Sequence, residues 1–201
     1  MPHFWSIKNA LPAAHPEIQR WYQNVLISQE ITTLTGESFT IISASPLPSE
    51  ETLLNFMSNP SWLEETVWYK KHPLYFSDAL KDSLESYQKE KYEDVIFKTA
   101  TRVEMICRVL YIHTKKKDVY CAVPASGGST LNSYIKSLSK CNYAESLENY
   151  WKTVESYISW NDQGETTRNK VFHGNNPELN YIHAQTMILS LILLLQIDFT
   201  P

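Results

Sequence analysis

The stretch MILSLILLL, residues 187 to 195, holds eight apolar residues and one serine. A membrane-spanning helix needs roughly 20 consecutive apolar residues, so this stretch is too short to cross a bilayer. A continuous apolar run of this length is typical of a helix surrounded by the rest of the protein. Asn176 is the expected N-cap and Pro177 the first helical position. We therefore predict a buried core helix from Pro177 to about Ile197.

Other regions carry the periodicity of amphipathic helices that would pack around this core helix. Between residues 143 and 160, apolar residues recur at three- and four-residue spacing: Leu147, Tyr150, Trp151, Val154, Tyr157 and Ile158. A similar pattern runs from 77 to 113, in one or two pieces, and a shorter one covers 130–140. The sequence therefore predicts an all-α fold, an antiparallel bundle of about four long helices over residues 78–201.

Residues 1–77 are expected to form a separate N-terminal extension, irregular but helical. Pro16 suits the first position of a helix that we expect to reach Gly36. Residues 38–48, SFTIISASPLP, are β-branched and then broken by proline, which predicts a loop or a short strand. Ser49 precedes two glutamates and is an expected N-cap. Further breaks are expected at Asn59-Pro60 and His72-Pro73, on either side of a short helix over 61–71.

The composition is that of an ordinary globular protein. The 201 residues are 43% hydrophobic, and 18 Lys and Arg stand against 22 Asp and Glu, a net charge of −4. An RNA partner would therefore have to meet a local basic patch. Cys107, Cys121 and Cys141 form no closely spaced pair, so we expect reduced intracellular thiols and no zinc or redox motif. The N-terminus lacks the pattern of a secretory signal, and we expect a cytoplasmic protein that uses no metal or other cofactor.

A polar segment, TTRNKVFHGNNPE at residues 166–178, directly precedes the predicted core helix. A threonine at its start can cap a short helix beginning near Arg168, which puts Asn169 and His173 on one face at i and i+4. A helix N-terminus favours phosphate, and arginine adds a bidentate phosphate donor. Histidine exchanges protons near neutral pH, and asparagine can orient a hydroxyl or a phosphate oxygen. The segment is therefore a candidate phosphate-handling site.

These residue types match metal-independent cleavage of RNA, in which the 2′-OH attacks the adjacent phosphorus. A base removes the hydroxyl proton, a cation stabilises the charge on the crowded phosphorus, and an acid protonates the leaving 5′-oxygen. We expect Arg168 to be the cation, His173 a proton-transfer group and Asn169 an orienting group. The reaction benefits from two proton-transfer groups, whereas the motif holds one histidine. A two-fold homodimer that brings two motifs together would supply both, so we expect a composite site.

The segment RNKVFH, residues 168–173, resembles the HEPN motif, an arginine followed after four to six residues by a histidine, often with a polar residue next to the arginine. Gly174 after the histidine is also common in HEPN proteins. These domains are helical bundles, frequently dimeric, and many are metal-independent endoribonucleases of toxin–antitoxin, antiphage or CRISPR-associated systems. The resemblance spans residues 78–201 and implies that fold, that activity, and catalytic roles for Arg168 and His173. It also implies a cognate antitoxin or regulator as partner, although Asn175 stands where some HEPN toxins carry a modified tyrosine.

Several basic and acidic residues are secondary candidates. Lys170 and the run Lys115, Lys116 and Lys117 are candidates for guiding RNA phosphates, although a solvated helix end is the simpler explanation for the run. Glu104 is a candidate for orienting His173, although an ordinary i,i+4 surface pair with Arg108 is the simpler explanation.

Other patterns are assigned to structure rather than to chemistry. A second Arg-x4-His segment, RVLYIH at residues 108–113, lies inside an amphipathic helix pattern and lacks the polar residue after the arginine. Tyr150, Trp151 and Tyr157 have the spacing of core residues rather than of a base-stacking platform, and His183 is a lesser candidate for facing the site. Two other functions stay open: a non-catalytic HEPN-like module that binds RNA, a nucleotide or a protein, and an unrelated helical interaction module.

Overall fold

The computed structural model describes residues 5–11, 14–26, 29–32, 38–41, 46–59, 61–116, 131–139, 145–159 and 179–199. Within these ranges the helices are α1 (Pro16–Leu26), α2 (Glu50–Ser58), α3 (Ser61–Glu64), α4 (Val67–Lys71), α5 (Pro73–Gln88), α6 (Tyr92–Lys116), α7 (Leu131–Leu138), α8 (Glu145–Ile158) and α10 (Tyr181–Leu195). The strands are β1 (Trp5–Ile7), β2 (Gln29–Thr32), β3 (Ser38–Ile41) and β4 (Ile197–Phe199). Helices make up most of this part of the chain, so the expected all-α fold is confirmed.

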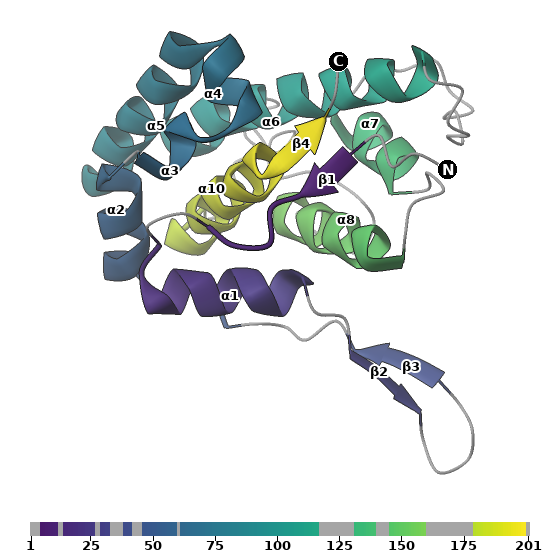
Figure 1. The fold of residues 1–201 in the computed structure, drawn as a ribbon. Helices are drawn as coiled ribbons and strands as arrows, with labels where there is room; N and C mark the ends of the chain where they lie inside the picture. The colour runs from purple at the N-terminus through teal and green to yellow at the C-terminus, as the bar shows by residue number, and fades with distance from the viewer. Residues whose placement is uncertain are drawn as a thin grey trace.

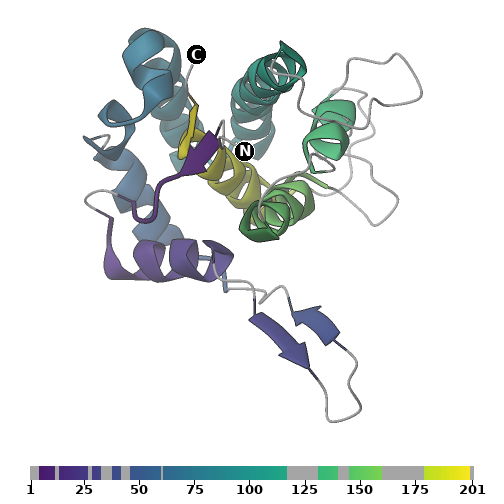
Figure 2. The same cartoon turned by 45° about the vertical axis from the view of Figure 1, so that its right-hand side comes forward.

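Helix α10 lies at the centre of the molecule, where α6 and α8 pack against it and α5 packs on α6 (Figures 1 and 2). Every residue from Met187 to Leu195 is at most 1% exposed. The one polar side chain of this stretch, Ser190, donates its hydroxyl to the Thr186 carbonyl at 2.8 Å, so the helix itself satisfies it. The predicted buried core helix is confirmed. In the described part of the chain, no helix is long and apolar enough to cross a membrane.

Helices α6 and α8 present their predicted apolar faces to this core. The buried residues of α6 include Val95, Ile96, Thr99, Val103, Ile106, Cys107 and Leu110, and those of α8 include Tyr150, Trp151, Val154 and Ile158. Burial raises the pKa of the Cys107 thiol, with a further contribution from the Glu104 charge, so this cysteine stays protonated at neutral pH.

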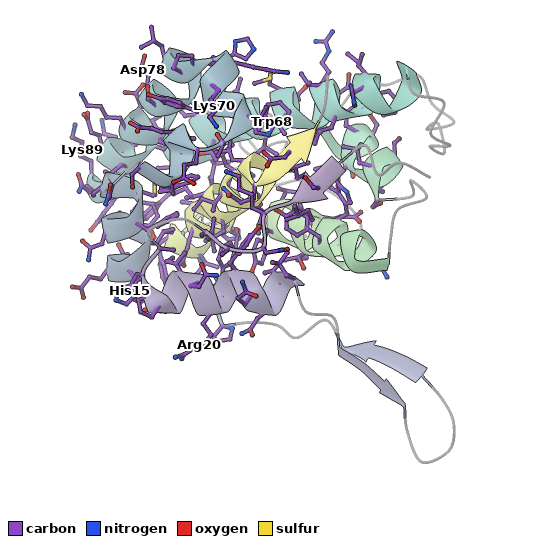
Figure 3. All side chains as sticks on the ribbon, viewed as in Figure 1. His15, Arg20, Trp68, Lys70, Asp78 and Lys89 are labelled. Carbon is purple, nitrogen blue, oxygen red and sulfur yellow. The ribbon has the colours of Figure 1, made fainter. Side chains whose placement is uncertain are left out.

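The N-terminal helices are bound to the rest of the chain by side-chain contacts. The Trp21 ring of α1 stacks on Tyr157 of α8 at 6.4 Å between centroids, and Trp21 Nε1 donates to the Tyr157 hydroxyl at 2.9 Å. Helix α1 therefore covers α8, while Arg20 projects from its outer side (Figure 3). Buried residues before and after residue 77 form one hydrophobic core cluster. Helix α5 spans the boundary that we drew at residue 77, and that division into two parts stays a prediction.

A glutamate joins α1 to α2. The Glu17 carboxylate accepts hydrogen bonds from the Thr52 hydroxyl at 2.6 Å and the Ser49 hydroxyl at 3.0 Å, as well as from the Ser49 backbone N–H. These hydrogen bonds, that from Thr52 first, lower the pKa of Glu17 because they stabilise its charged form. Ser49 is also the N-cap of α2, as its sequence position predicts.

The two ends of the described chain pair in a short antiparallel sheet that the sequence did not predict. Strand β1 pairs with β4 in the register Trp5 with Phe199 and Ile7 with Ile197. Trp68 points from α4 toward β4 and donates its Nε1 hydrogen to the Ile197 carbonyl at 3.0 Å (Figure 3). Strands of three residues carry too little periodicity to stand out in a sequence.

Two expected helices have different limits in the structure. Helix α1 ends at Leu26 rather than at Gly36, because the chain then forms strand β2 and, after residue 37, strand β3. Residues 31–33 are Ile-Thr-Thr, and β-branched residues favour strand over helix. The expected short helix over 61–71 is divided into α3 and α4, because Thr66 is the N-cap of α4 and accepts from the Tyr69 N–H at 3.1 Å.

The core helix also begins later than its sequence suggests. Leu179 and Asn180 are not helical, and α10 begins at Tyr181 with Asn180 as its N-cap, so the prediction of a start at Pro177 was wrong. The sequence offers two candidate asparagine N-caps, Asn176 and Asn180. In the structure, Asn180 is the one that accepts hydrogen bonds from the first turn of α10. The helix ends at Leu195, two residues before the expected limit, because the chain turns there into β4.

Candidate functional site

The main residues of the predicted site lie outside the part of the chain that the structure describes. These residues are Arg168, Asn169, Lys170, His173 and Lys117. Lys115 and Lys116 belong to the last turn of α6, and their side chains are also outside the described set. The roles proposed for all of them stay predictions.

The segment that carries the motif is attached to two core helices. The described chain stops at Ser159, directly after α8, and resumes at Leu179, directly before α10. Ser159 closes the end of α8, because its backbone N–H and its hydroxyl both donate to the Glu155 carbonyl, at 3.0 and 2.7 Å. Because both helices bury apolar faces in the same core, the ends of the segment are fixed by packing rather than by the segment itself.

The junction with α10 is a capping box with histidine as its third helical residue. The Asn180 side-chain oxygen accepts from the backbone N–H groups of Ile182 at 3.1 Å and His183 at 3.4 Å. In return, His183 Nδ1 accepts from the Asn180 backbone N–H at 3.3 Å. Two of the backbone donors that a helix leaves unpaired at its start, and the cap's own N–H, are thereby satisfied. The box fixes where the chain leaving the motif enters the core.

His183 is half-buried, and its role in this box requires a neutral ring. A protonated imidazole carries hydrogens on both nitrogens and has no acceptor, so Nδ1 can accept only in the neutral form. Burial lowers the pKa of His183, which favours the same neutral form. The structure therefore gives His183 a capping role, and its suggested orientation toward the site stays a prediction.

The residues of the second Arg-x4-His segment lie within α6. Arg108 is exposed and His113 is half-buried, and residues five apart on a helix lie about 140° apart around its axis. Glu104 is half-buried four residues before Arg108. The prediction that Glu104 orients His173 is untested, since His173 is outside the described residues.

The aromatic residues of α8 belong to the core. Tyr150 and Trp151 are completely buried, and the Tyr150 hydroxyl donates to the Leu193 carbonyl of α10. Tyr157 is partly buried against Trp21. The sequence-based preference for core packing over base stacking is confirmed for these three side chains.

The starts of α2, α6 and α10 lie close to the end of α5, where tyrosines gather. The rings of Tyr87 and Tyr92 meet edge to face at 5.6 Å. Burial raises the pKa of Tyr87, and the nearby groups of Glu50, Tyr92 and Tyr181 raise it further. Tyr181, at the first position of α10, is 45% exposed. Because Tyr181 follows Asn180 directly, this surface adjoins the segment that carries the motif.

A shallow groove lies between α2 and the last turn of α5. Its lining consists of Glu50, Glu51, Leu54, Asn55, Ser58 and Gln88. Two carboxylates and no cationic side chain face this groove among the described residues, so it does not suit an RNA backbone. Within the described ranges, no three His, Cys, Asp or Glu side chains gather in a way that could hold a metal ion.

Comparisons of the chain with protein-family models, with curated proteins and with solved structures gave no match. The candidate site therefore depends on the residues of 166–178, on their resemblance to the HEPN motif and on the helices to which they are attached.

Proposed function

We propose that this protein is a metal-independent endoribonuclease of the HEPN type that acts as a homodimer. The observation that carries the proposal is the segment from Arg168 to Gly174, with arginine, asparagine and histidine in the HEPN spacing. The all-α fold supports it, because HEPN domains are helical bundles. The attachment of the motif to two buried helices supports it further, since a catalytic group is most effective when a rigid scaffold holds it.

Each residue of the motif has a distinct task in the proposed reaction. The Arg168 guanidinium neutralises the charge that builds on phosphorus as the 2′-oxygen attacks. His173 of one copy removes the 2′-OH proton, and His173 of the other protonates the leaving 5′-oxygen. Asn169 orients the attacking hydroxyl or a phosphate oxygen. The products are a 2′,3′-cyclic phosphate and a 5′-hydroxyl, with no water consumed in this step.

RNA binding requires positive charge that the acidic groove between α2 and α5 lacks. In this proposal Lys170 and the lysines at the end of α6 supply it, together with Arg168. A toxin or antiphage effector is the biological class that the HEPN resemblance favours, and such a protein would have a cognate antitoxin or regulator.

The proposal is tested by RNA cleavage in EDTA, with structured and unstructured RNAs and with end-group analysis. We expect wild type to leave 2′,3′-cyclic phosphate ends and His173→Ala and Arg168→Ala to lose at least about a hundredfold in rate, as for groups that transfer a proton or stabilise charge. Arg108→Ala is the matched control, since Arg108 is exposed and has the same spacing to a histidine. It should cleave like wild type.

The other outcomes are equally informative. Equal cleavage by wild type and His173→Ala would contradict the proposed site. No cleavage by wild type, together with RNA or nucleotide binding that Arg168→Ala abolishes, would replace the enzyme with a non-catalytic HEPN-like binding module.

A further inference from the structure

The first turn of α10 differs from the rest of that helix because little of it is buried. Asn180 is exposed, Tyr181 is 45% exposed and Ile182 is 41% exposed. From residue 184 to residue 195, by contrast, all residues but Thr186 are buried. Segments with few buried contacts open locally at a lower free energy than the core does. The first turn is therefore the part of α10 that packing stabilises least.

Contacts on either side limit how far this turn can open. The Gln185 side-chain amide donates to the carbonyl of Pro48, a residue that lies just before the N-cap of α2. Gln185 is 3% exposed, so this hydrogen bond holds α10 from inside the core. On the other side, Leu179 packs against the core. Local opening is therefore expected to involve the residues between Leu179 and Gln185.

Within these limits the capping box stabilises the turn. The Asn180 side chain accepts from the N–H groups of Ile182 and His183, and His183 Nδ1 accepts from the Asn180 N–H at 3.3 Å. Protonation of His183 removes this acceptor. It also adds a positive charge at the helix N-terminus, which is the positive end of the helix dipole. Both effects destabilise the turn as the pH falls.

Histidine is the side chain whose ordinary pKa, about 6.5, lies in the range where this change would occur. The described titratable groups near the start of α10 are Glu50 of α2, Tyr87 of α5 and Tyr92 of α6. Burial and nearby charges raise the pKa of both tyrosines, so they stay neutral at neutral and acid pH. Helix α8 contacts α10 near its other end, where Tyr150 bonds to the Leu193 carbonyl.

We infer that the start of α10 is an acid-sensitive joint. Protonation of His183 opens the capping box and loosens the turn from Asn180 to His183. Segment 160–178, which carries the RNKVFH motif, enters the core helix through this turn. The joint therefore lies between the candidate site and the core. The inference depends on the capping geometry and on the exposure of the turn, and it does not require ribonuclease activity.

The test is the solvent exchange of backbone amides, followed residue by residue with NMR at pH 7.5 and at pH 5. Ile182 and Ile188 are matched probes, because they are the same residue type in one helix and Ile188 is fully buried. We expect the Ile182 amide to be far less protected than that of Ile188, because it exchanges through local opening. After correction for the intrinsic pH dependence of exchange, the protection of Ile182 should fall about fivefold at pH 5.

Two variants assign this fall to His183. Glutamine is a usual residue at this position of a capping box, so His183→Gln keeps an acceptor for the Asn180 N–H but does not titrate. In His183→Gln, the protection of Ile182 should stay the same at both pH values. His15→Gln is the matched control, because His15 Nδ1 accepts from the Glu17 N–H, also at 3.3 Å, at the start of α1. This variant should show the same fall at Ile182 as wild type.

Three results would overturn the inference. They are equal falls at Ile182 in wild type and His183→Gln, protection of Ile182 in wild type that does not change with pH, and protection of Ile182 as high as that of Ile188. A fall in wild type and not in His183→Gln, in a protein that does not cleave RNA, would leave the joint standing while the proposed function fails. Unchanged protection in an active ribonuclease would do the reverse.

Discussion

Helix α10 and the β2–β3 hairpin both carry apolar residues, but the two elements lie in different places in the molecule. Met187 to Leu195 are surrounded by other helices of the same chain, and none is more than 1% exposed. The hairpin, whose strands include Ile31, Phe39 and Ile41, extends away from that body (Figure 1). Apolar residues at the centre stabilise the fold of one chain. The hairpin lies away from this centre, so we expect its apolar residues to contribute less to that stability.

The largest expected difference between these regions is in folding stability. Ile192→Ala leaves a cavity in a fully buried site and should lower the free energy of unfolding by about 2–5 kcal/mol. Ile31→Ala, the same change in the hairpin, should lower it by less than about 1 kcal/mol in the monomer. Denaturant titrations at low protein concentration measure both. Equal losses would show that the hairpin belongs to the core, and the comparison would fail.

A smaller effect is expected where the motif-bearing segment enters the core. Asn180→Ala removes the cap of α10 and should lower the free energy of unfolding by about 1 kcal/mol. Asn55→Ala is the matched control, because Asn55 is exposed inside α2 and should change stability by less than about 0.5 kcal/mol. A cap variant as stable as this control would mean that α10 needs no fixed start, and that packing alone sets its position.

The smallest effect is a pH dependence at the same junction. The pKa of His183 is lowered by burial, so the unfolded chain takes up a proton at this residue more readily than the folded chain does. Its contribution to stability is complete above the ordinary histidine pKa of about 6.5 and is lost as the pH falls through the lowered folded pKa. His183→Gln keeps an acceptor for the Asn180 N–H but does not titrate. Its free energy of unfolding should fall less between pH 7.5 and pH 5 than that of wild type, and an identical fall would remove His183 as the cause.

The sequence predicts the centre of this molecule better than its margins. The run from Met187 to Leu195 predicts a buried core helix, because it is too short to span a membrane and too apolar to lie on the protein surface. The stripe of α8 and the buried face of α6 follow from helical periodicity in the same way. The start of α10 was placed four residues early, because Asn176-Pro177 and Asn180 are both good starts and only the structure shows which asparagine bonds the first turn.

The elements that the sequence missed depend on contacts between distant residues. Strand β1 exists because β4, at the other end of the chain, pairs with it. Strand β2 was expected to continue α1, since single β-branched residues weaken a helix without excluding it, whereas β3 lies in the stretch 38–48 that was predicted as a loop or a short strand. At the candidate site, the sequence supplied Arg168, Asn169 and His173 through their spacing. It gave no sign of the histidine capping box, because histidine is not among the usual residues at that position.

The most direct test of the account is the mixing of wild type with an inactive chain. Wild type and His173→Ala are purified separately, dissociated at low concentration, mixed in equal amounts and assayed for RNA cleavage in EDTA. A composite site that uses His173 of both copies predicts that roughly half of the dimers lack one proton-transfer group, so the mixture should cleave at about a quarter of the rate of the same total amount of wild type. A mixture that cleaves at about half of that rate, as independent sites in each copy would, would contradict a site shared between two copies.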